Sequence, residues 1–450
     1  MTDKLDFKRV LPIFVIVLVD LLGLTIIIPL LSLYAATFKA DALTIGVLAA
    51  AYPLAQFIGA PILGRLSDRF GRRPVLIFSQ VGTLIGLLVL GFANTLPVVF
   101  LSRIIDGLSG ANISTAQAVI ADSTNEKTRT QGLGLIGAAF GLGFTVGPLI
   151  AFIALGASGN NYRVPAFVAA GFSAVSILLS LFWLKETRPE GYVPAAQRTL
   201  RIGSLKSALT HPGVGLLLIL ISAQQIAFGG FEQILPLFAL SRLGLNASAI
   251  SGMFIFLGIL IVVIQGGLIR QWSRRFGDRW LVLMGLVTLS VGLVLVAFTP
   301  AQPPPFYDRA AVVAELTASP DPAAAEKLLV PIPVQGETGY LGLAWILLAF
   351  IPATIGGSVL QPTINSFLTK RVDKGEIGGI LGISASLVSL ANAAGPLIGG
   401  ALFRFVSPTA TLLFQGLLMA ALLPFAIRTL RGEERPNTGT KASELIAGKH

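Results

Sequence analysis

The chain has 450 residues, of which 54% are hydrophobic and only 12% are charged, and its mean hydropathy is +0.80. So little polar surface cannot cover a water-soluble domain of this size. The formal net charge of +11 does not indicate nucleic acid, because the Lys and Arg residues punctuate apolar runs instead of lining one face. We therefore predict a helical membrane protein that is in contact with the lipid bilayer and has no nucleic-acid partner.

Residue types that carry common site chemistry are scarce. The chain has no Cys and two His, so neither a disulfide framework nor a thiolate or histidine metal centre is expected. No glycine-rich phosphate loop ending in Lys-Ser or Lys-Thr is present, which argues against an ATP-driven pump. We predict no enzyme activity, no cofactor and no metal site.

Twelve apolar segments, each long enough to cross a bilayer as a helix, follow one another along the chain. They lie near residues 10–34, 44–64, 75–93, 97–121, 131–155, 164–184, 213–240, 247–269, 280–298, 341–368, 377–403 and 408–428. Short alternating segments of the kind that build β-barrels are absent. The predicted fold is an all-α polytopic membrane protein with twelve transmembrane helices in two pseudo-symmetric six-helix bundles.

The segments also predict domain limits and orientation. The predicted parts are an N-terminal bundle at 1–184, a polar linker at 185–212, a C-terminal bundle at 213–430 and a tail at 431–450. Most Lys and Arg residues fall on the inner side when both termini are cytoplasmic. We therefore expect a multi-pass protein of a bacterial inner membrane with cytoplasmic termini, functional as a monomer.

The two halves repeat each other's motifs. FGRR at Phe70–Arg73 recurs as FGDR at Phe276–Arg279, 206 positions later, and TVGPLIA at 145–151 recurs within NAAGPLIGG at 392–400, 248 positions later. Many transporters are built from such repeats. The difference between the offsets places an insertion of about forty residues near 299–340, between the ninth and tenth spans. Because it is rich in proline, we favour a disordered loop over a small cap.

Several motifs in one order carry a family resemblance. They are DLLGLTIIIPLL in the first span, YPLAQFIGAPILG in the second, GRLSDRFGRR after it, LSRIIDGLSGA in the fourth and GLGFTVGP in the fifth. Together they resemble the drug/proton antiporter branch of the major facilitator superfamily, which includes the tetracycline exporters. The resemblance implies exchange of protons for a small amphipathic or lipophilic molecule, by rocking of two halves around a central cavity. The alternatives are a facilitator or symporter for a metabolite such as a sugar, a lipid flippase, and a non-transporting receptor on the same scaffold.

The charged stretch after the second span suggests a latch. The positive-inside bias explains its arginines but not its two glycines or its aspartate. Helix N-termini offer unpaired N–H groups and a positive dipole end, so we hypothesise that Asp68 caps the eleventh span at Gly378 and holds the halves together on the cytoplasmic side. The predicted latch residues are Gly64, Asp68, Arg69, Gly71, Arg72, Arg73 and Gly378.

Asp20, Arg103, Asp106 and Glu232 are the ionisable residues that we place well within spans. Such residues usually face a cavity and act. The resemblance implicates the arginine of LSRIIDG in proton coupling and the aspartate of DLLG in lining the cavity. We predict that Asp20 carries the proton, that Arg103 modulates it and that Asp106 orients Arg103. A purely structural ion pair between Arg103 and Asp106 is the alternative.

Further candidates for the substrate cavity lie on the seventh span. Gln225, Phe228 and Glu232 share one helical face, which suits a ligand that is partly apolar and partly cationic or hydrogen-bonding. A hydrated Glu232 at the outer interface is the alternative. Weaker candidates for the cavity, which interhelical hydrogen bonds explain almost as well, are Gln56, Asn112, Gln117 and Asn365.

Small residues on the fifth span predict close helix packing. The residues of this packing motif are Gly137, Gly141, Gly143, Gly147 and Pro148. The chain also departs from the tetracycline exporters, which carry an aspartate in the third span and a histidine and an aspartate in the second half. Gly86 stands at the third-span position, and spans eight and nine contain no histidine or carboxylate. We therefore do not expect tetracycline as the substrate.

Overall fold

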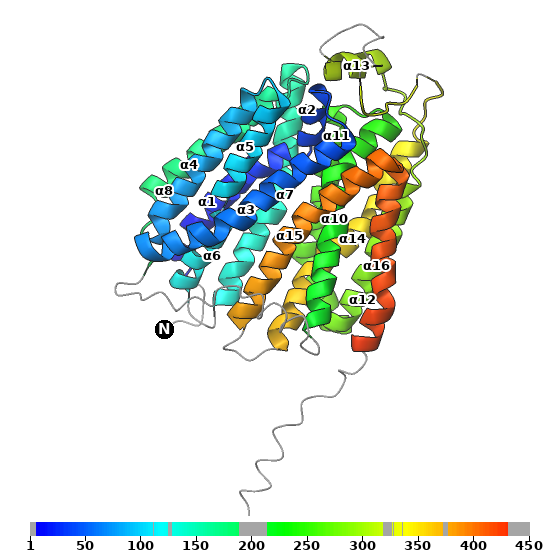
Figure 1. Cartoon of the computed structure of the whole chain (residues 1–450). Helices are drawn as coiled ribbons and strands as arrows, with labels where there is room; N and C mark the ends of the chain where they lie inside the picture. Colours follow the sequence, from blue (N-terminus) through cyan, green and yellow to red (C-terminus); the bar gives the residue numbers. More distant parts are fainter. Residues whose placement is uncertain are drawn as a thin grey trace, which may run out of the picture.

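The computed structural model describes residues 6–110, 112–124, 128–188, 214–317, 326, 328–334, 336–371 and 377–430, and for a few helical residues, including Asn112 and Gly378, only the backbone. The described chain is a bundle of long helices (Figure 1). Their bounds are α1 Phe7–Ile27, α2 Leu31–Thr37, α3 Ala42–Phe70, α4 Arg72–Gly91, α5 Leu96–Ser109, α6 Asn112–Ser123, α7 Arg129–Ser158, α8 Arg163–Phe182, α10 Gly215–Leu243, α11 Ala247–Val263, η1 Ile264–Leu268, α12 Ile269–Ala297, α13 Arg309–Thr317, α14 Leu341–Lys370, α15 Ile377–Phe405 and α16 Pro408–Leu430.

The helices supply the twelve predicted crossings. Among the described residues, 10 helices are long and apolar enough to span a membrane. One of them, Ala247–Ala297, has 51 residues, whereas about 20 suffice for one crossing. It bends at Gly277, whose φ of 79° is not helical, and so provides two crossings. The shorter α5 and α6 together provide the last one, and the predicted twelve-helix fold is confirmed.

Capping residues mark the starts of two equivalent helices in the two halves. Asp41 accepts a hydrogen bond from the backbone N–H of Thr44 at 2.7 Å and begins α3. Asn246 accepts one from the backbone N–H of Ala249 at 3.0 Å and begins α11. Such caps satisfy N–H groups that the first helical turn leaves open. Local sequence therefore fixes where the second and eighth spans start.

The charged stretch after the second span is mostly helical. α3 continues to Phe70 and α4 begins at Arg72, so Gly71 alone departs from helical geometry. Gly71 and Gly277 adopt nearly the same backbone conformation, with φ and ψ of 110° and 158° against 79° and 161°. Positive φ is readily adopted by glycine. The repeated FGRR and FGDR motifs therefore make the same turn in both halves.

The fourth predicted span is broken in the middle. α5 ends at Ser109 with Gly110 as its C-cap, and α6 begins at Asn112. The Gly110 carbonyl accepts a hydrogen bond of 2.6 Å from the Nε2 atom of Gln56 on α3. An unpaired carbonyl inside a membrane is costly, so this side-chain donor stabilises the break.

The helices fall into two groups, α1–α8 and α10–α16, which meet where α3 packs on α15 and α7 packs on α11 (Figure 1). A Cβ atom added at Gly46 would lie 2.4 Å from the carbonyl oxygen of Pro396, and one added at Gly258 would lie 2.5 Å from that of Phe144. The backbones of the two groups are therefore in direct contact at these glycines, which leaves no space for side chains.

The contacts between the groups concentrate at one end of the molecule. We call the end at which α1 begins and α16 ends the terminal end, and the opposite end, which carries α13, the distal end (Figure 1). Asp41 accepts hydrogen bonds from Arg404, and the Ser32 hydroxyl donates to the carbonyl of Gln233 at 2.9 Å. Among the described residues, every hydrogen bond between the groups lies in the distal part. The groups are thus joined at the distal end.

The insertion near 299–340 contains a docked helix, so the disordered loop that we favoured is wrong for its described part. Val312, Val313 and Leu316 of α13 are buried against the distal end. The Glu315 carboxylate accepts hydrogen bonds from the Tyr162 hydroxyl at 2.6 Å and the Asn160 amide at 2.9 Å, both of the first group. It also accepts one from the first backbone N–H of α11, at 3.3 Å. The insertion is a cap that bridges the two groups.

The packing motif of α7 lies largely against α1. Cβ atoms added at Gly143 and Gly147 would lie 3.4 Å from Leu21 and 2.1 Å from the Thr25 hydroxyl. Pro148 is buried beside them, and Gly141 has the side chain of Val262 on α11 nearby, at 3.9 Å. α7 therefore packs between α1 and the second group, as predicted for Gly143, Gly147 and Pro148. Gly137, also predicted for this motif, is exposed and takes no part in the packing.

Replacing Gly147 with Ala will destabilise this contact. The new methyl group overlaps Thr25, and overpacking of this kind typically costs about 1–3 kcal/mol. Gly137→Ala is the matched control, because nothing lies within 4 Å of a Cβ atom there. Thermal unfolding in detergent will give a lower Tm for Gly147→Ala and an unchanged or higher Tm for Gly137→Ala. Equal shifts would contradict the packing described here.

The docking of α13 will depend on pH through Glu315. Burial raises the pKa of Glu315 above its ordinary value, and the hydrogen bonds from Tyr162, Ala247 and Asn160 offset this only in part. The contribution to stability is therefore full below the ordinary pKa and is lost as pH rises through the raised one. Hydrogen-exchange protection of α13, corrected for intrinsic rates, will fall with rising pH in the wild type and stay level in Glu315→Gln. Asp308→Asn, at the exposed start of the same helix, is the control and will show the same fall in protection as the wild type. If protection of α13 still fell with rising pH in Glu315→Gln, the role of Glu315 would be refuted.

Candidate functional site

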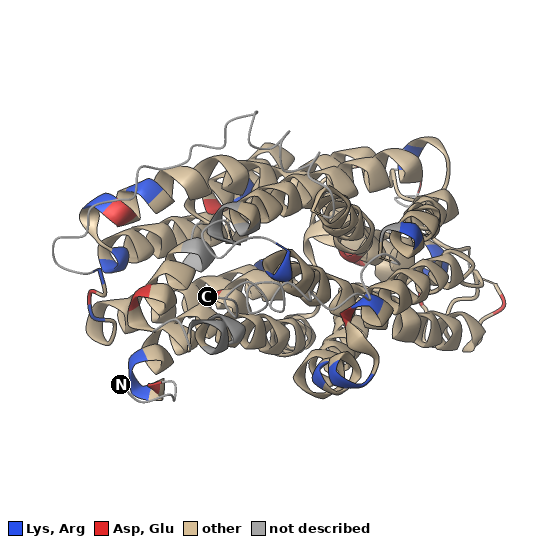
Figure 2. Cartoon of the chain, turned by 90° about the horizontal axis from the view of Figure 1, so that it is seen from below, with Lys and Arg blue, Asp and Glu red and all other residues tan. Residues whose placement is uncertain are grey.

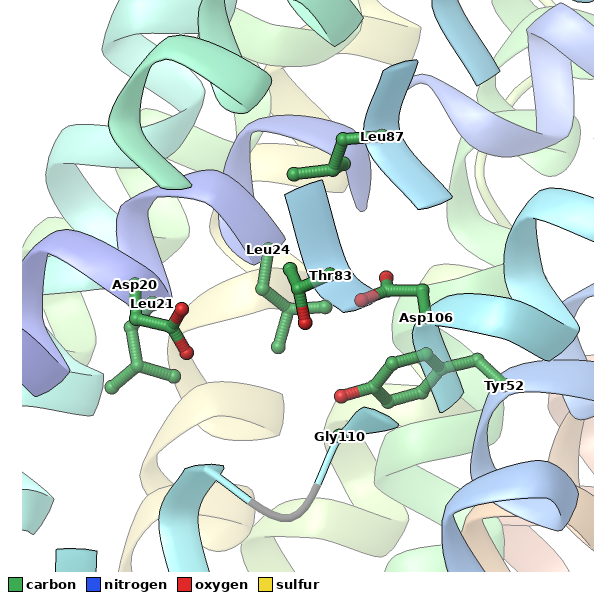
Figure 3. Close-up of a pocket in the computed structure, with 8 residues that line it drawn as sticks. All are labelled: Asp20, Leu21, Leu24, Tyr52, Thr83, Leu87, Asp106 and Gly110. Atoms are coloured by element: carbon green, nitrogen blue, oxygen red, sulfur yellow. The ribbon is translucent and has the colours of Figure 1, made fainter. Parts of the chain in front are cut away.

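A small cavity lies among the helices of the first group (Figure 3). The residues that line it come from α1, α3, α4 and the end of α5, and they are Asp20, Leu21, Leu24, Tyr52, Thr83, Leu87, Asp106 and Gly110. Two carboxylates that are 86 positions apart in sequence thus line one cavity within the predicted membrane region. Acidic groups in such a place are rare and usually functional.

The Asp106 carboxylate is neutralised by its neighbours. Arg103 and Asp106 are 2% and 3% exposed, and an Arg103 Nη1 donor lies 3.1 Å from an Asp106 oxygen. The Thr83 hydroxyl of α4 donates a second hydrogen bond to Asp106. The Nη2 atom of Arg103 is buried without a hydrogen-bond partner among the described residues. The ion pair therefore satisfies Asp106 while leaving one donor of the guanidinium open.

The Asp20 side chain projects from α1 into the same cavity (Figure 3). Leu21, the next residue, packs against Gly143 of α7, and this contact fixes the rotation of α1 at the cavity. The structure thus brings together Asp20 and Asp106, with Arg103 paired to Asp106 behind the cavity wall. These are the three residues that we predicted for proton coupling.

Gly86 explains how α4 and α5 approach each other. A Cβ atom at this position would lie 2.9 Å from the Asp106 Cβ atom and 3.0 Å from the Ser102 carbonyl oxygen. Any larger residue there would collide with α5 as it is packed here. The acidic group in this region comes instead from α5, as Asp106.

Tyr52 and Thr83 are the site residues that sequence reasoning missed. Neither carries a charge, and an uncharged polar residue in a membrane span is commonly explained by helix packing. The available signal was the four-residue spacing of Tyr52 and Gln56 in YPLAQ, which places both on one face of α3. Gln56 itself does not line the cavity but donates to the Tyr52 hydroxyl at 3.3 Å.

The candidates in the second half lie apart from this cavity. Gln225 donates to the side-chain oxygen of Asn392 at 2.6 Å, and Phe228 lies 5.9 Å from Phe231, centroid to centroid. Glu232 is partly exposed and has no hydrogen bond or ion pair among the described residues. The Oδ1 atom of Asn365 is buried and also has no hydrogen-bond partner among the described residues.

Two weaker candidates contribute less. Gln117 of α6 is exposed, and the side chain of Asn112 lies outside the described residues. Of the predicted substrate-cavity residues, Glu232 on α10 and Asn365 on α14 therefore keep polar atoms that a ligand could engage.

The contacts described for the charged stretch lie within its own half. The Arg72 guanidinium contacts Asp68 at 2.6 Å, Asp122 of α6 at 3.0 Å and the Ser67 hydroxyl at 2.8 Å. Arg73 donates to two carbonyls at the end of α8. Arg69 lies over the ring of the adjacent phenylalanine, and no atom lies within 4 Å of a Cβ atom at Gly64.

Glu186 fixes the turn at Gly71. Burial alone would raise the pKa of the Glu186 carboxyl, but hydrogen bonds from the backbone N–H groups of Arg188, Arg72, Arg73 and Thr187 lower it below its ordinary value. The N-terminus of α4 is thus capped from the segment after α8. Gly378, the predicted partner of Asp68, lies outside the residues whose side chains are described, so the latch stays a hypothesis.

The second half carries the same ion pair with its charges exchanged. The repeat offsets of 206 and 248 place Asp278 at the position of Arg72 and Lys370 at that of Asp122. Lys370 contacts Asp278 at 2.6 Å, and Asp278 also accepts from Ser273, as Arg72 donates to the equivalent serine. Figure 2 looks onto this terminal end and shows Lys and Arg in both groups of helices. The repeat therefore preserves the contact and inverts its polarity.

The two pairs will differ in strength and in salt dependence. Asp122 is 14% exposed and Lys370 is 64% exposed. Asp122→Asn will cost about 1–3 kcal/mol, because it weakens a partly buried charged hydrogen bond. Lys370→Gln will cost less than about 1 kcal/mol, and this loss will vanish at high salt. Thermal unfolding at low and high salt measures the loss of stability in both variants. If Lys370→Gln lost as much stability as Asp122→Asn at high salt, the stated difference between the two ion pairs would be wrong.

Comparisons with known proteins agree with this architecture. The family model described as Major Facilitator Superfamily matches residues 13–317. The chain is 28% identical over 404 residues to the tetracycline resistance protein, class B, of Escherichia coli, with 88% of each chain covered. It is 28% identical over 386 residues to multidrug resistance protein 1 of Bacillus subtilis, covering 85% of this chain and 86% of that one.

Solved structures support the fold. The human organic anion transporter MFSD10 superposes with a TM-score of 0.60 at 21% identity, covering 93% of this chain and 99% of that one. The nucleoside transporter NupG superposes with a TM-score of 0.69 at 13% identity, over 95% of this chain and 99% of that one. At these identities the likeness concerns the fold alone.

Proposed function

Because the chain belongs to the Major Facilitator Superfamily, we propose that it exports a small amphipathic or lipophilic compound in exchange for protons. The protein is a multi-pass membrane transporter of a small molecule, not an enzyme. The proposal adds the proton coupling, the direction of transport and the substrate class. The two carboxylates in one cavity of the first half are the observation that carries it.

The orientation follows from the positive-inside bias. We assign the terminal end to the cytoplasm of a bacterial cell and the distal end to the outer side of its inner membrane. The hydrogen bonds described between the groups then lie on the outer side, as expected of an inward-facing state. Transport requires that these contacts, including Asp41 with Arg404, open while the cytoplasmic ends close.

The proposed coupling uses Asp20 as the proton carrier. A carboxylic acid in a poorly solvated cavity is easier to protonate than one in water, and it can release its proton when water reaches it from the other side. Arg103 keeps Asp106 ionised by pairing with it, and its open Nη2 donor offers a second carboxylate a partner as helices shift. Rocking of the halves thus changes the surroundings of Asp20.

The proposed substrate region lies toward the second half. Glu232 and Phe228 of α10 and Asn365 of α14 offer a carboxylate, an aromatic ring and an amide, which fits a partly apolar molecule with a cationic or hydrogen-bonding group. The names of the relatives mention tetracycline and multidrug resistance. Gly86 and the absence of His and acidic residues from spans eight and nine favour a substrate other than tetracycline.

The proposed latch operates in the opposite state. Asp68 is held by Arg72 in the first half, close to the terminal end. When the terminal ends approach, the N-terminus of α15 comes within reach of this carboxylate, and its N–H groups can bind it. The latch then stabilises the outward-facing state.

Flux in proteoliposomes tests the proposal. Ethidium transport will depend on an imposed pH gradient in the wild type, and Asp20→Asn will abolish the dependence because an amide cannot carry the proton. Asp6→Asn, at the exposed start of the same helix, is the matched control and will retain coupling. The purified protein will transport at the same rate per chain when reconstituted at a high lipid excess, as a monomer should.

Other outcomes identify the alternatives. Wild-type flux that ignores the gradient would contradict antiport and favour a facilitator. Lack of flux with any sugar, lipid or organic cation would favour a receptor on the same scaffold.

A further inference from the structure

We propose that Tyr52 is the positioning residue that links the two carboxylates of the cavity, by donating its phenolic hydrogen to Asp20 or to Asp106 but not to both. The inference rests on the proposed function, since it concerns the same proton site. It assigns a role to a residue that composition and charge did not single out.

The close-up shows the arrangement on which the inference is built. The hydroxyl of Tyr52 and the carboxylates of Asp20 and Asp106 point into one cavity from three different helices (Figure 3). Among the described residues that line it, Asp20 and Asp106 are the acidic ones. The hydroxyl of Thr83 also faces the cavity and donates to Asp106. An ionised carboxylate is a stronger acceptor than a hydroxyl, so we expect the phenol to donate to one of the two carboxylates.

The hydrogen-bonding capacity of Tyr52 fixes its role as a donor. Gln56 donates an amide hydrogen to the Tyr52 oxygen at 3.3 Å. A phenol has one hydrogen to give. Because the Tyr52 oxygen accepts from the Gln56 amide, the phenolic hydrogen of Tyr52 points away from that amide. That single hydrogen can stabilise one ionised carboxylate at a time, which makes the two carboxylates compete for it.

The backbone holds Tyr52 at the break in the fourth span. A Cβ atom at Gly107 would lie 2.4 Å from the Tyr52 carbonyl oxygen, and one at Gly110 would lie 2.9 Å from the Tyr52 hydroxyl. The same Gln56 amide that contacts the hydroxyl donates to the Gly110 carbonyl at 2.6 Å. Any movement of α5 relative to α6 at this break therefore moves the phenol and its hydrogen.

These contacts connect protonation with conformation. When Asp20 takes up a proton, it no longer needs the phenolic hydrogen, which becomes available to Asp106. Asp106 then has three donors, from Arg103, Thr83 and Tyr52, and its ion pair with Arg103 can loosen. The open donor of Arg103 would gain freedom to move as the halves rock. Only hydrogen bonds rearrange in this scheme, and Tyr52 keeps its proton.

Other charged groups on the neighbouring helices are engaged elsewhere or lie outside the cavity lining. Arg404 of α15 bonds Asp41, and Arg72 of α4 bonds Asp122 of α6. On α8, Arg163 bonds Asn94. On α10, Arg242 bonds Thr409, and Glu232 is not among the cavity residues. The described charges that face Tyr52 are thus Asp20, Asp106 and Arg103.

The test compares Tyr52→Phe with the wild type in proteoliposomes that carry ethidium. Loss of the donor makes the ionised carboxylate less stable, so the pH midpoint of gradient-driven transport will rise by about one unit. Ethidium counterflow at equal pH on both sides, which needs no net proton movement, will stay within about twofold of the wild type. Tyr34→Phe is the matched control, because this tyrosine bonds the carbonyls of Leu90 and Ala93 away from the cavity.

A spectroscopic measurement keeps the test independent of transport. Infrared titration of the purified full chain follows the carboxyl stretching band, and the component lost in Asp20→Asn identifies Asp20. This component will titrate at higher pH in Tyr52→Phe, whereas Tyr34→Phe will leave it in place.

The inference would be overturned if Tyr52→Phe changed neither the pH at which the Asp20 band titrates nor the pH midpoint of transport. Equal shifts of these two values in Tyr34→Phe would also overturn it. If Asp20→Asn retained gradient-driven transport, the proposed function would fail, while the infrared shift would still decide the link between Tyr52 and the carboxylates.

Discussion

The cost of placing charge in a poorly solvated membrane interior governs this structure. An ionised side chain there is unfavourable by several kcal/mol unless other groups neutralise it. Asp106 meets this constraint with Arg103 and Thr83, and the close approach of α4 and α5 at Gly86 makes that arrangement possible. A second carboxylate, Asp20, lines the same cavity. In the proposed coupling, a proton neutralises it.

The joining of the two helix groups makes this chemistry dependent on conformation. α7 packs on Asp20's helix through Gly143 and Gly147, and on the second group through the contact with Gly258. α7 therefore connects the second group with the helix that carries Asp20. At the distal end, Glu315 of the inserted helix bonds both groups and adds a contact that the internal repeat does not supply.

Periodicity and composition predicted the twelve crossings because each span must satisfy its own backbone within the membrane. Charge in apolar surroundings likewise identified Asp20, Arg103 and Asp106. Tyr52 was missed because its proposed role depends on the helix break at Gly110. A glycine within an apolar run does not by itself predict such a break. The docked α13 was missed because a proline-rich composition predicts disorder. The tertiary contacts that hold this helix, such as those of Leu316, cannot be recognised from composition. The ion pair between Asp278 and Lys370, whose charges are exchanged relative to the first half, could be recognised only from the repeat offsets and the structure together.

The central claim is that the protein exchanges its substrate for protons and that Asp20 carries the proton. Proton release on substrate binding measures this directly, with a pH-sensitive dye and the purified protein in weakly buffered detergent. The account predicts that added ethidium releases protons from the wild type and that Asp20→Asn releases none while still binding ethidium. Binding to the wild type without proton release, or equal release from Asp20→Asn, would contradict it.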